Sequence, residues 1–209
     1  LVANNLICEK LHDLNPEIQI ISEEGKKKLN RKADIFWLVD PLDGTREFIK
    51  KNGEFTVNIA LVKNGRPIYG VIYLPTKKEI YYTFNKSAYY SKINLRNKYV
   101  SKKKIKVKQR KQLNHRVLLL SRSHSRNIEL SKKHFKTEKV IFSGSSIKFC
   151  LIANGNGNIY PRLGTTMEWD TAAGHAILNA AGGSVKTLNG RVLRYGKQGF
   201  KNTSFIARS

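Results

Sequence analysis

Acidic side chains occur in three short segments of this sequence, at spacings that suit chemistry. Asp40 and Asp43 stand three residues apart in the segment DPLDGT, Glu23 and Glu24 follow a short apolar run, and Asp170 follows a tryptophan. Two carboxylates brought together by a tight turn repel each other unless a cation lies between them. Mg²⁺ prefers oxygen ligands, and two such ions can hold the attacking and leaving oxygens of phosphoryl transfer. The pattern indicates a metal-dependent site for phosphoryl transfer.

Each acid also has a purely structural interpretation. Asp-Pro and Asp-Gly are common turn dipeptides whose side chains hydrogen-bond their own backbone. Asp170 could cap the helix expected after it, and the Glu23–Glu24 pair could lie in a solvated loop. The sequence contains no Cys/His metal pattern, Walker loop or Gly-x-Ser-x-Gly elbow that would favour another chemistry.

The acids fall at the ends of expected elements, where loops converge to build sites. An amphipathic helix is predicted to end at Leu14, and the apolar strand before Asp40 is predicted to end there. The first half should hold strands over 18–21, 36–39, 55–62, 68–74 and 79–84, with a strand edge and linker around 100–112. Asn64-Gly65 is a strong hairpin signal, so these strands should form an antiparallel meander.

The second half alternates strands with helices. Helices are predicted over 128–134, 145–153 and 171–181, and strands over 117–121, 140–142, 158–160 and 204–207. This change of pattern predicts an α/β protein with two packed parts. The first part, 1–112, would carry most of the metal-binding acids. The second part, 113–209, would carry substrate contacts and Asp170.

The chain is strongly basic, with 39 Lys and Arg against 15 Asp and Glu and a formal charge of +24 over 209 residues. Eleven of the basic residues lie between Lys92 and Arg116. Such charge attracts anionic small molecules or an acidic membrane surface, and it can bind nucleic acid without reading its sequence. The many Lys, Asn and Ile residues equally fit the codon bias of an AT-rich genome, so no specific nucleic-acid partner is predicted.

The composition also bears on location. No apolar run approaches the ~20 residues of a membrane helix, and two cysteines build neither a disulfide framework nor a zinc site. We expect a cytoplasmic protein, with peripheral contact to the cytoplasmic face of the inner membrane permitted by its basic surface. Cys150 should lie in the core, and His175 should be structural.

Three separated motifs resemble the inositol monophosphatase-like superfamily, in the same order. They are Ser22-Glu23-Glu24, the block Trp37–Thr45 with Glu47-Phe48, and Trp169–Gly174. The resemblance covers essentially the whole chain and implies a layered α-β-α-β-α sandwich. It also implies two or three Mg²⁺ ions bound by carboxylates and by one backbone carbonyl: Glu23, Asp40, Asp43, Asp170 and, through its carbonyl, Leu42. Glu24 would support this set from behind.

The resemblance also implies roles in hydrolysis. Gly44 and Thr45 would hold the scissile phosphate, and Thr45 would orient the attacking water together with the catalytic acids Glu23 and Asp43. Family members carry a further N-terminal helix and a Thr-x-x-Asp segment before the position of Leu1, whose Asp partners this threonine. From this we expect either a fragment of a longer product or a truncated gene.

Within the superfamily, the closest likeness is to bacterial 3′(2′),5′-bisphosphate nucleotidases of the CysQ type. It rests on residues 47–58, 121–124, 144–150 and 160–162. It implies contacts to the nucleotide from His124, Ser145, Ser146, Lys148 and Arg162, besides the metal-site residues Glu23, Leu42, Asp43, Gly44, Thr45 and Asp170.

The implied reaction removes the 3′-phosphate from adenosine 3′,5′-bisphosphate, or from its sulfated analogue, in sulfur assimilation, with inhibition by lithium. Two other functions stay open at this point. One is a broader inositol- or sugar-phosphate phosphatase of the same superfamily. The other is a non-catalytic basic binding protein derived from it, either a decayed enzyme or an RNA-associated factor.

Overall fold

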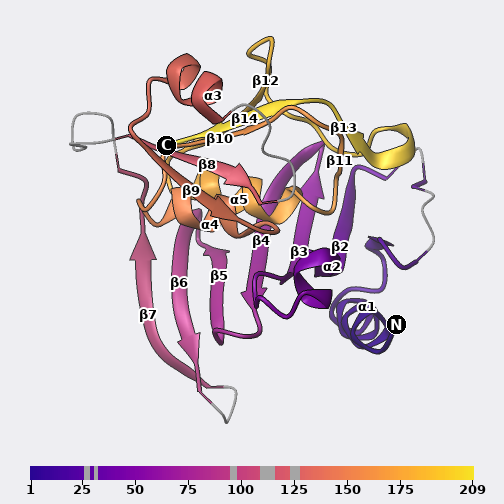
Figure 1. Cartoon of the computed structure of the whole chain (residues 1–209). Coiled ribbons are helices and arrows are strands. Elements are labelled where there is room, and N and C mark those ends of the chain that lie inside the picture. Colours follow the sequence, from indigo (N-terminus) through magenta and orange to yellow (C-terminus); the bar gives the residue numbers. More distant parts are fainter. Residues whose placement is uncertain (26–28, 31–32, 95–97, 109–115, 123–127) are drawn as a thin grey trace.

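The protein folds into alternating layers of helices and sheets (Figure 1). A computed structural model describes residues 1–25, 29–30, 33–94, 98–108, 116–122 and 128–209. Helix α1 (Val2–Leu14) lies against the first strands of a large sheet, and helices α4 (Ile147–Ala153) and α5 (Ala172–Ala180) lie between that sheet and a smaller one. Helix α3 (Ile128–Phe135) covers the smaller sheet from outside. The predicted α-β-α-β-α order of layers is confirmed.

The large sheet has seven strands in the described part of the chain, in the order β1 to β7. Their bounds are Gln19–Ser22, Ile35–Asp43, Thr56–Lys63, Arg66–Leu74, Glu79–Phe84, Ser87–Ile93 and Tyr99–Ile105. Strand β1 runs parallel to β2, and all later neighbours pair antiparallel. The predicted meander is therefore confirmed, and its turn at Asn64-Gly65 places both residues at positive φ, as a tight hairpin requires.

One face of the large sheet is buried beneath helix α5. Alternate residues of β2 point to this face, so Phe36 and Leu38 are buried in the main core. The helix and strand β4 approach so closely that a Cβ atom on Gly70 would overlap the backbone of Ala173. This packing fixes the start of α5, and with it Asp170, against the strands that carry the other acids.

The smaller sheet has the order β12-β14-β10-β8-β9 among the described strands. Their bounds are, in the order of the chain, Val117–Ser121 (β8), Lys139–Ser143 (β9), Ile159–Arg162 (β10), Ser184–Thr187 (β12) and Phe205–Arg208 (β14). Strand β8 pairs parallel with β9 and β10, while β14 is antiparallel to β10 and β12. Phe135 of α3 packs against Leu118 and Leu120 in a second apolar cluster, which holds the outer helix on this sheet.

Several expectations about the elements are wrong. Strand β2 does not end at Asp40 but continues to Asp43, with a shift of its register against β3 between these two residues. Strand β6 and the short pair β11 (Thr166–Met167) and β13 (Lys201–Asn202) were not predicted. Helix α4 begins at Ile147 rather than at Ser145. The proposed boundary at residue 112 lies outside the described residues and stays a prediction.

Strand β7 is the last strand of the large sheet and carries much of the basic charge. Lys102, Lys103 and Lys104 are all exposed on it. The ammonium group of Lys102 lies 4.5 Å from the ring centroids of both Phe84 and Tyr89. The strand predicted around residue 100 is thus an edge strand, and one of its lysines, Lys102, lies over two aromatic rings.

None of the helices in the described ranges is long and apolar enough to cross a membrane.

Candidate active site

A small cavity of about 210 Å³ lies where the two sheets and the start of α5 meet. The segment from Asp43 to Glu47, which includes the start of α2 (Thr45–Ile49), forms one wall, and strands β8 and β10 also contribute lining residues. The cavity is lined by Asp43, Gly44, Thr45, Arg46, Glu47, Ser121, Ser145, Lys148, Phe149, Tyr160, Arg162, Thr166, Asp170 and Thr171. Residues from the second and third motifs thus meet at this cavity, whereas Glu23 of the first motif does not line it.

The acids of the three motifs act on one another electrostatically. Asp40 is only 1% exposed. Its pKa is raised well above the ordinary range, first by burial and then by the negative charges of Asp43, Glu23 and Asp170. Burial, the Asp43 charge and that of Glu23 likewise raise the pKa of Asp170 to about 7. Four carboxyl groups that are distant in sequence therefore share one electrostatic environment.

Asp43 is held in place by donors from the neighbouring strand and loop. Its Oδ2 accepts hydrogen bonds from the Ser146 amide at 2.6 Å, from Asn58 Nδ2 at 3.2 Å and from Thr56 Oγ1 at 3.3 Å. Burial raises the pKa of Asp43, and the Lys148 charge and these hydrogen bonds oppose that rise. The side chain is thus oriented by the protein through Oδ2 alone, as far as the described residues are concerned.

Asp40 and Asp170 each bond to a nearby backbone amide. Asp40 Oδ1 accepts from the Leu42 amide at 2.9 Å, which is the turn-forming contact expected of an Asp-Pro segment. Asp170 Oδ2 accepts from the Met167 amide at 2.8 Å. The N-cap of α5 is Thr171, without a side-chain capping bond. The capping interpretation of Asp170 is therefore wrong, and its charge is left to act on the cavity.

The acid set suits a hard divalent cation in its chemistry. Among the described residues, Asp40, Glu23 and Asp170 form no ion pair with a basic side chain, and the positive charge of Arg162 only partly opposes the rise in the pKa of Asp170. In the same part of the chain, however, no three His, Cys, Asp or Glu side chains are gathered tightly enough to form a ready-made metal site. The residues fit Mg²⁺ by type and charge, and the ligand set stays a prediction.

The other predicted metal-site residues lie beside this cluster. Glu23 is exposed just after β1, where its backbone amide donates to the Val39 carbonyl at 3.1 Å. Gly44 has φ +91° and is the N-cap residue of α2, and Thr45 is the first residue of that helix. A Cβ on Gly44 would lie 3.2 Å from the Ser145 Cβ, so the turn predicted to bind phosphate and the loop predicted to bind the nucleotide are in close contact.

Basic and hydroxyl groups of the second half line the same cavity as Asp43 and Asp170. Lys148 is 1% exposed, and its Nζ donates to the carbonyls of Ser143 at 2.9 Å and Ser145 at 2.7 Å. Burial lowers the pKa of Lys148 to about 8, against the opposing effect of Asp43. Within the described ranges, Ser145 Oγ and Arg162 Nε are buried without a hydrogen-bond partner. Such unpaired donors suit an anionic ligand.

Ser146 and His124 complete the predicted nucleotide contacts. Ser146 is buried, and its Oγ donates to Asn58 Oδ1 at 2.7 Å and lies 2.8 Å from Thr56 Oγ1. Ser146 therefore bonds to the same side chains that hold Asp43 and does not face the cavity. His124 lies outside the described residues, so its predicted contact with adenine stays a prediction.

A buried polar network supports the turn that carries Asp170. Glu168 is fully buried and accepts from the amides of Gly196 at 2.6 Å and Lys197 at 3.1 Å. Tyr195 OH donates to Thr171 Oγ1 at 3.3 Å and lies 3.0 Å from His175 Nδ1. Burial lowers the pKa of His175 to about 3. The structural role predicted for His175 is confirmed, as is the burial of Cys150.

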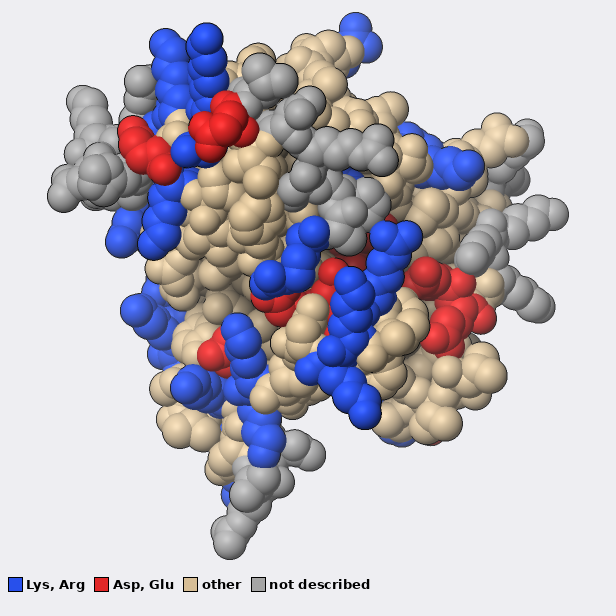
Figure 2. All heavy atoms as spheres, in the orientation of Figure 1, with Lys and Arg blue, Asp and Glu red and all other residues tan. Residues whose placement is uncertain are grey.

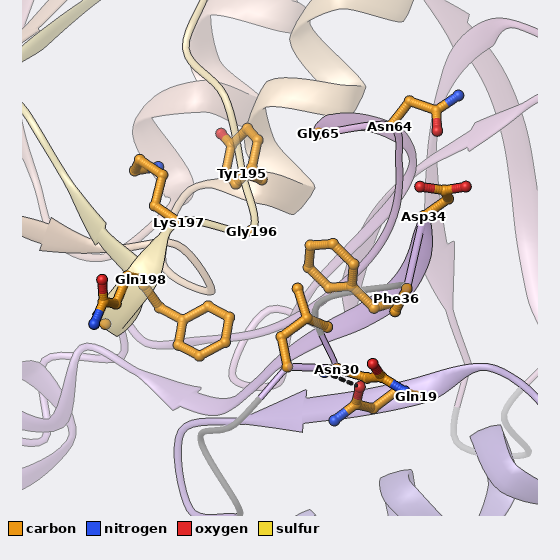
Figure 3. A pocket seen from close by; sticks show the side chains of 14 residues that line it. Gln19, Asn30, Asp34, Phe36, Asn64, Gly65, Tyr195, Gly196, Lys197 and Gln198 are labelled. Carbon is orange, nitrogen blue, oxygen red and sulfur yellow. Dashed lines mark hydrogen bonds between the residues drawn. The ribbon is translucent and has the colours of Figure 1, made fainter.

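A larger cavity, of about 1120 Å³, opens at the other end of strands β1 and β2 (Figure 3). Gln19, at the start of β1, and Phe36, near the start of β2, line it together with Tyr195 and Lys197. Lys197 pairs there with Glu168, at 2.5 Å. This cavity lacks the acid cluster, so the smaller one is the candidate active site despite its size.

The face around the cavity carries both acidic and basic side chains. Figure 2 shows acidic atoms at the centre of the face, with long Lys and Arg side chains projecting beside them. Arg46, at the cavity wall, is one exposed basic residue near the acids that the sequence did not single out. A basic rim over an acidic centre favours an anionic substrate whose reacting group meets cations at the centre.

Sequence and structure comparisons agree on the class of this protein. Residues 1–208 match the inositol monophosphatase family, and the chain belongs to that family. Its relatives include the 3′(2′),5′-bisphosphate nucleotidase CysQ of Buchnera aphidicola subsp. Acyrthosiphon pisum (strain APS), 47% identical over 211 residues, which cover 98% of this chain and 77% of that protein. The CysQ of Escherichia coli (strain K12) is 39% identical over 210 residues, covering 98% and 81%.

A solved structure shows the same relationship. The crystal structure of CysQ from Bacteroides thetaiotaomicron, a bacterial member of the inositol monophosphatase family, superposes with a TM-score of 0.81 at 40% identity. The superposition covers 96% of this chain and 81% of that one. The superfamily resemblance inferred from three motifs is thereby confirmed, as is the CysQ likeness inferred from residues 47–58, 121–124, 144–150 and 160–162.

Proposed function

We propose that this protein is a Mg²⁺-dependent 3′(2′),5′-bisphosphate nucleotidase that hydrolyses the 3′-phosphate of adenosine 3′,5′-bisphosphate. Water adds to the phosphorus and the bond from phosphorus to the 3′ oxygen breaks, which gives AMP and inorganic phosphate. The observation that carries the proposal is the shared electrostatic environment of Asp40, Asp43, Glu23 and Asp170. The names of relatives at 39–47% identity over 98% of the chain support the choice of substrate.

The metal site is proposed from the donor set. Glu23, Asp40, Asp43 and Asp170, with the carbonyl of Leu42, would hold two or three Mg²⁺ ions. When bound, these ions supply a water nucleophile at neutral pH and charge for the leaving oxygen. The protein holds its part of the site rigidly, because Asp43 accepts three hydrogen bonds and Asp40 and Asp170 one each from backbone amides.

The remaining side chains bind and orient the substrate. Gly44 and Thr45 hold the scissile phosphate at the cavity wall, and the Thr45 hydroxyl orients the attacking water. Ser145 Oγ and Arg162 Nε, which lack partners within the described ranges, bind the second phosphate. Arg162 can do so through two parallel bonds. Lys148, whose Nζ donates to two backbone carbonyls, adds positive charge to the cavity wall.

The first test is phosphate release from adenosine 3′,5′-bisphosphate with Mg²⁺, without Mg²⁺, and with Mg²⁺ plus Li⁺. We expect Mg²⁺-dependent release that Li⁺ inhibits, and slower release from inositol 1-phosphate and AMP. Faster release from inositol 1-phosphate would replace the nucleotide assignment with a broader phosphatase. No metal-dependent release, together with RNA binding that falls steeply with salt, would favour a basic binding protein instead.

A matched pair of variants locates the chemistry. Asp43→Asn removes one charge from the acid set and keeps an oxygen acceptor for Ser146. Asp34→Asn makes the same change at the exposed rim of the larger cavity. Loss of turnover in Asp43→Asn and its retention in Asp34→Asn is the expected result.

A cytoplasmic location and peripheral contact with an anionic membrane stay predictions.

A further inference from the structure

Glu54, in the segment between α2 and β3, makes a two-point contact with Arg122 at the end of β8. Arg122 donates from its terminal nitrogen to Glu54 Oε1 at 2.6 Å and from Nε to Oε2 at 3.0 Å. These residues are 68 positions apart, and they lie in loops that belong to different sheets. Parallel bonds of this kind fix direction as well as distance.

The same carboxylate also holds the loop after β9. The amide of Gly144 donates to Glu54 Oε2 at 2.8 Å, and Arg122 donates to the carbonyl of Phe142 at 3.3 Å. Burial would raise the pKa of Glu54, but the bonds from Arg122 and Gly144 outweigh it, and the pKa is lowered. Glu54, Arg122 and Gly144 thus form a three-part contact, which we term the Glu54 clamp.

The loop held by the Glu54 clamp leads directly into the predicted substrate contacts. Ser145 adopts a positive φ of +44°, which costs a residue with a side chain free energy and so needs external restraint. The next amide, that of Ser146, donates to Asp43 Oδ2 at 2.6 Å. One loop therefore presents Ser145 to the cavity and bonds to an acid of the site.

Packing around Gly144 leaves little freedom for this loop. A Cβ atom there would lie 2.6 Å from Glu47 Cγ and 2.9 Å from the Glu54 carbonyl oxygen. Real Cβ atoms do not approach that closely, so the loop sits directly on the segment that follows the Asp-Gly-Thr turn. Release of the Glu54 clamp on one side would let Ser145 relax and withdraw from the cavity.

We propose that Glu54 and Arg122 are positioning residues, which hold the Gly144–Ser145 backbone in its substrate-binding conformation without touching the substrate. The proposal rests on the proposed function for the identity of the substrate. It assigns Arg122 to Glu54 rather than to the nucleotide, although Arg122 lies in one of the blocks that resemble nucleotide-contacting segments.

The test is a double-mutant cycle of Glu54→Gln, Arg122→Met and both together, with Glu129→Gln as control. Glu129 pairs with Lys132 on the exposed side of α3, so it matches the chemistry of Glu54 away from the cavity. Hydrogen exchange of the peptide 142–149 is measured without substrate, and KM and kcat are measured with adenosine 3′,5′-bisphosphate. Urea midpoints show that each variant is folded.

In each single variant, we expect the amide hydrogens of residues 144–146 to exchange about tenfold faster than in the wild type. We also expect KM to rise about tenfold, with a smaller change in kcat. The double variant should match the single ones, because both break one unit. Arg122→Lys, which keeps the charge and loses the two-point contact, should resemble Arg122→Met.

Two results would overturn the proposal. Additive effects on KM with unchanged exchange would mean that Arg122 binds the substrate directly. Unchanged exchange and unchanged KM would mean that the Glu54 clamp positions nothing. If the wild type does not turn over the bisphosphate, the proposed function fails, while the exchange measurement still decides whether Glu54 and Arg122 restrain the loop.

Discussion

Replacing His175 by Asn should remove a specific part of the acid sensitivity of this fold. His175 is buried and neutral, with its pKa lowered to about 3 by burial. In the unfolded chain a histidine has its ordinary pKa of about 6.5. Below pH 6.5 this histidine is therefore protonated in the unfolded state but remains neutral in the folded state. The contribution of the neutral, buried His175 to the free energy of unfolding is therefore fully present above pH 6.5 and is lost progressively as the pH falls toward about 3.

The size of the effect follows from proton linkage. Between pH 7 and pH 5 this one histidine should lower the free energy of unfolding by about 2 kcal/mol, a loss that the Asn variant lacks. Asp40 and Asp170, whose raised pKa values favour the folded state in acid, are present in both proteins and cancel in the difference. An amide can still bond to Tyr195, so the variant should remain folded.

Urea titrations followed by tryptophan fluorescence at pH 7, 6 and 5 measure this difference. The wild type should lose about 2 kcal/mol more than His175→Asn over this range, and the exposed His134→Asn should behave like the wild type. Parallel pH profiles for wild type and His175→Asn would refute the reasoning, because they would show that the buried imidazole does not resist protonation.

Three further outcomes are expected. Asp43→Asn should lower kcat by at least about 10²-fold with a urea midpoint close to that of the wild type, and near-normal turnover would contradict the metal role of Asp43. Arg162→Ala should raise KM about tenfold for the bisphosphate and far less for a monophosphate; equal effects in steady-state kinetics would refute the second-phosphate site. Gly70→Ala should destabilise the fold by about 1–3 kcal/mol because α5 must shift, whereas Gly164→Ala, which meets nothing within 4 Å, should leave the urea midpoint within about 0.5 kcal/mol of the wild type.

The difference between what the sequence predicted and what it missed is clearest at the hairpins. Asn64-Gly65 carries the residue type that positive φ favours, and the hairpin was predicted from it. The turn from β5 to β6 uses Asn85 and Lys86, both at positive φ, without a glycine. Asparagine favours this conformation but lysine rarely adopts it, so the local sequence contains only a weak signal for the turn, and β6 was missed with it.

The site shows the same limit. Acids at strand and helix ends were predictable because each lies within a motif of adjacent residues. The bond between Glu54 and Arg122 joins positions 68 apart, and the loop that holds Ser145 at positive φ is bonded to Asp43 through the next amide, that of Ser146. Such features arise only when the two sheets pack, so they cannot be read from spacing along the chain.

The lysines of strand β7 have a consequence for how copies of this protein behave in solution. An edge strand exposes unpaired backbone groups that can template pairing with another chain, and charged side chains oppose such pairing. Two copies that met edge to edge would bring Lys102, Lys103 and Lys104 of each together. Their repulsion extends over about 10 Å at moderate ionic strength and weakens as salt is added. Part of the large positive charge therefore opposes pairing through this edge, separately from any attraction of substrate.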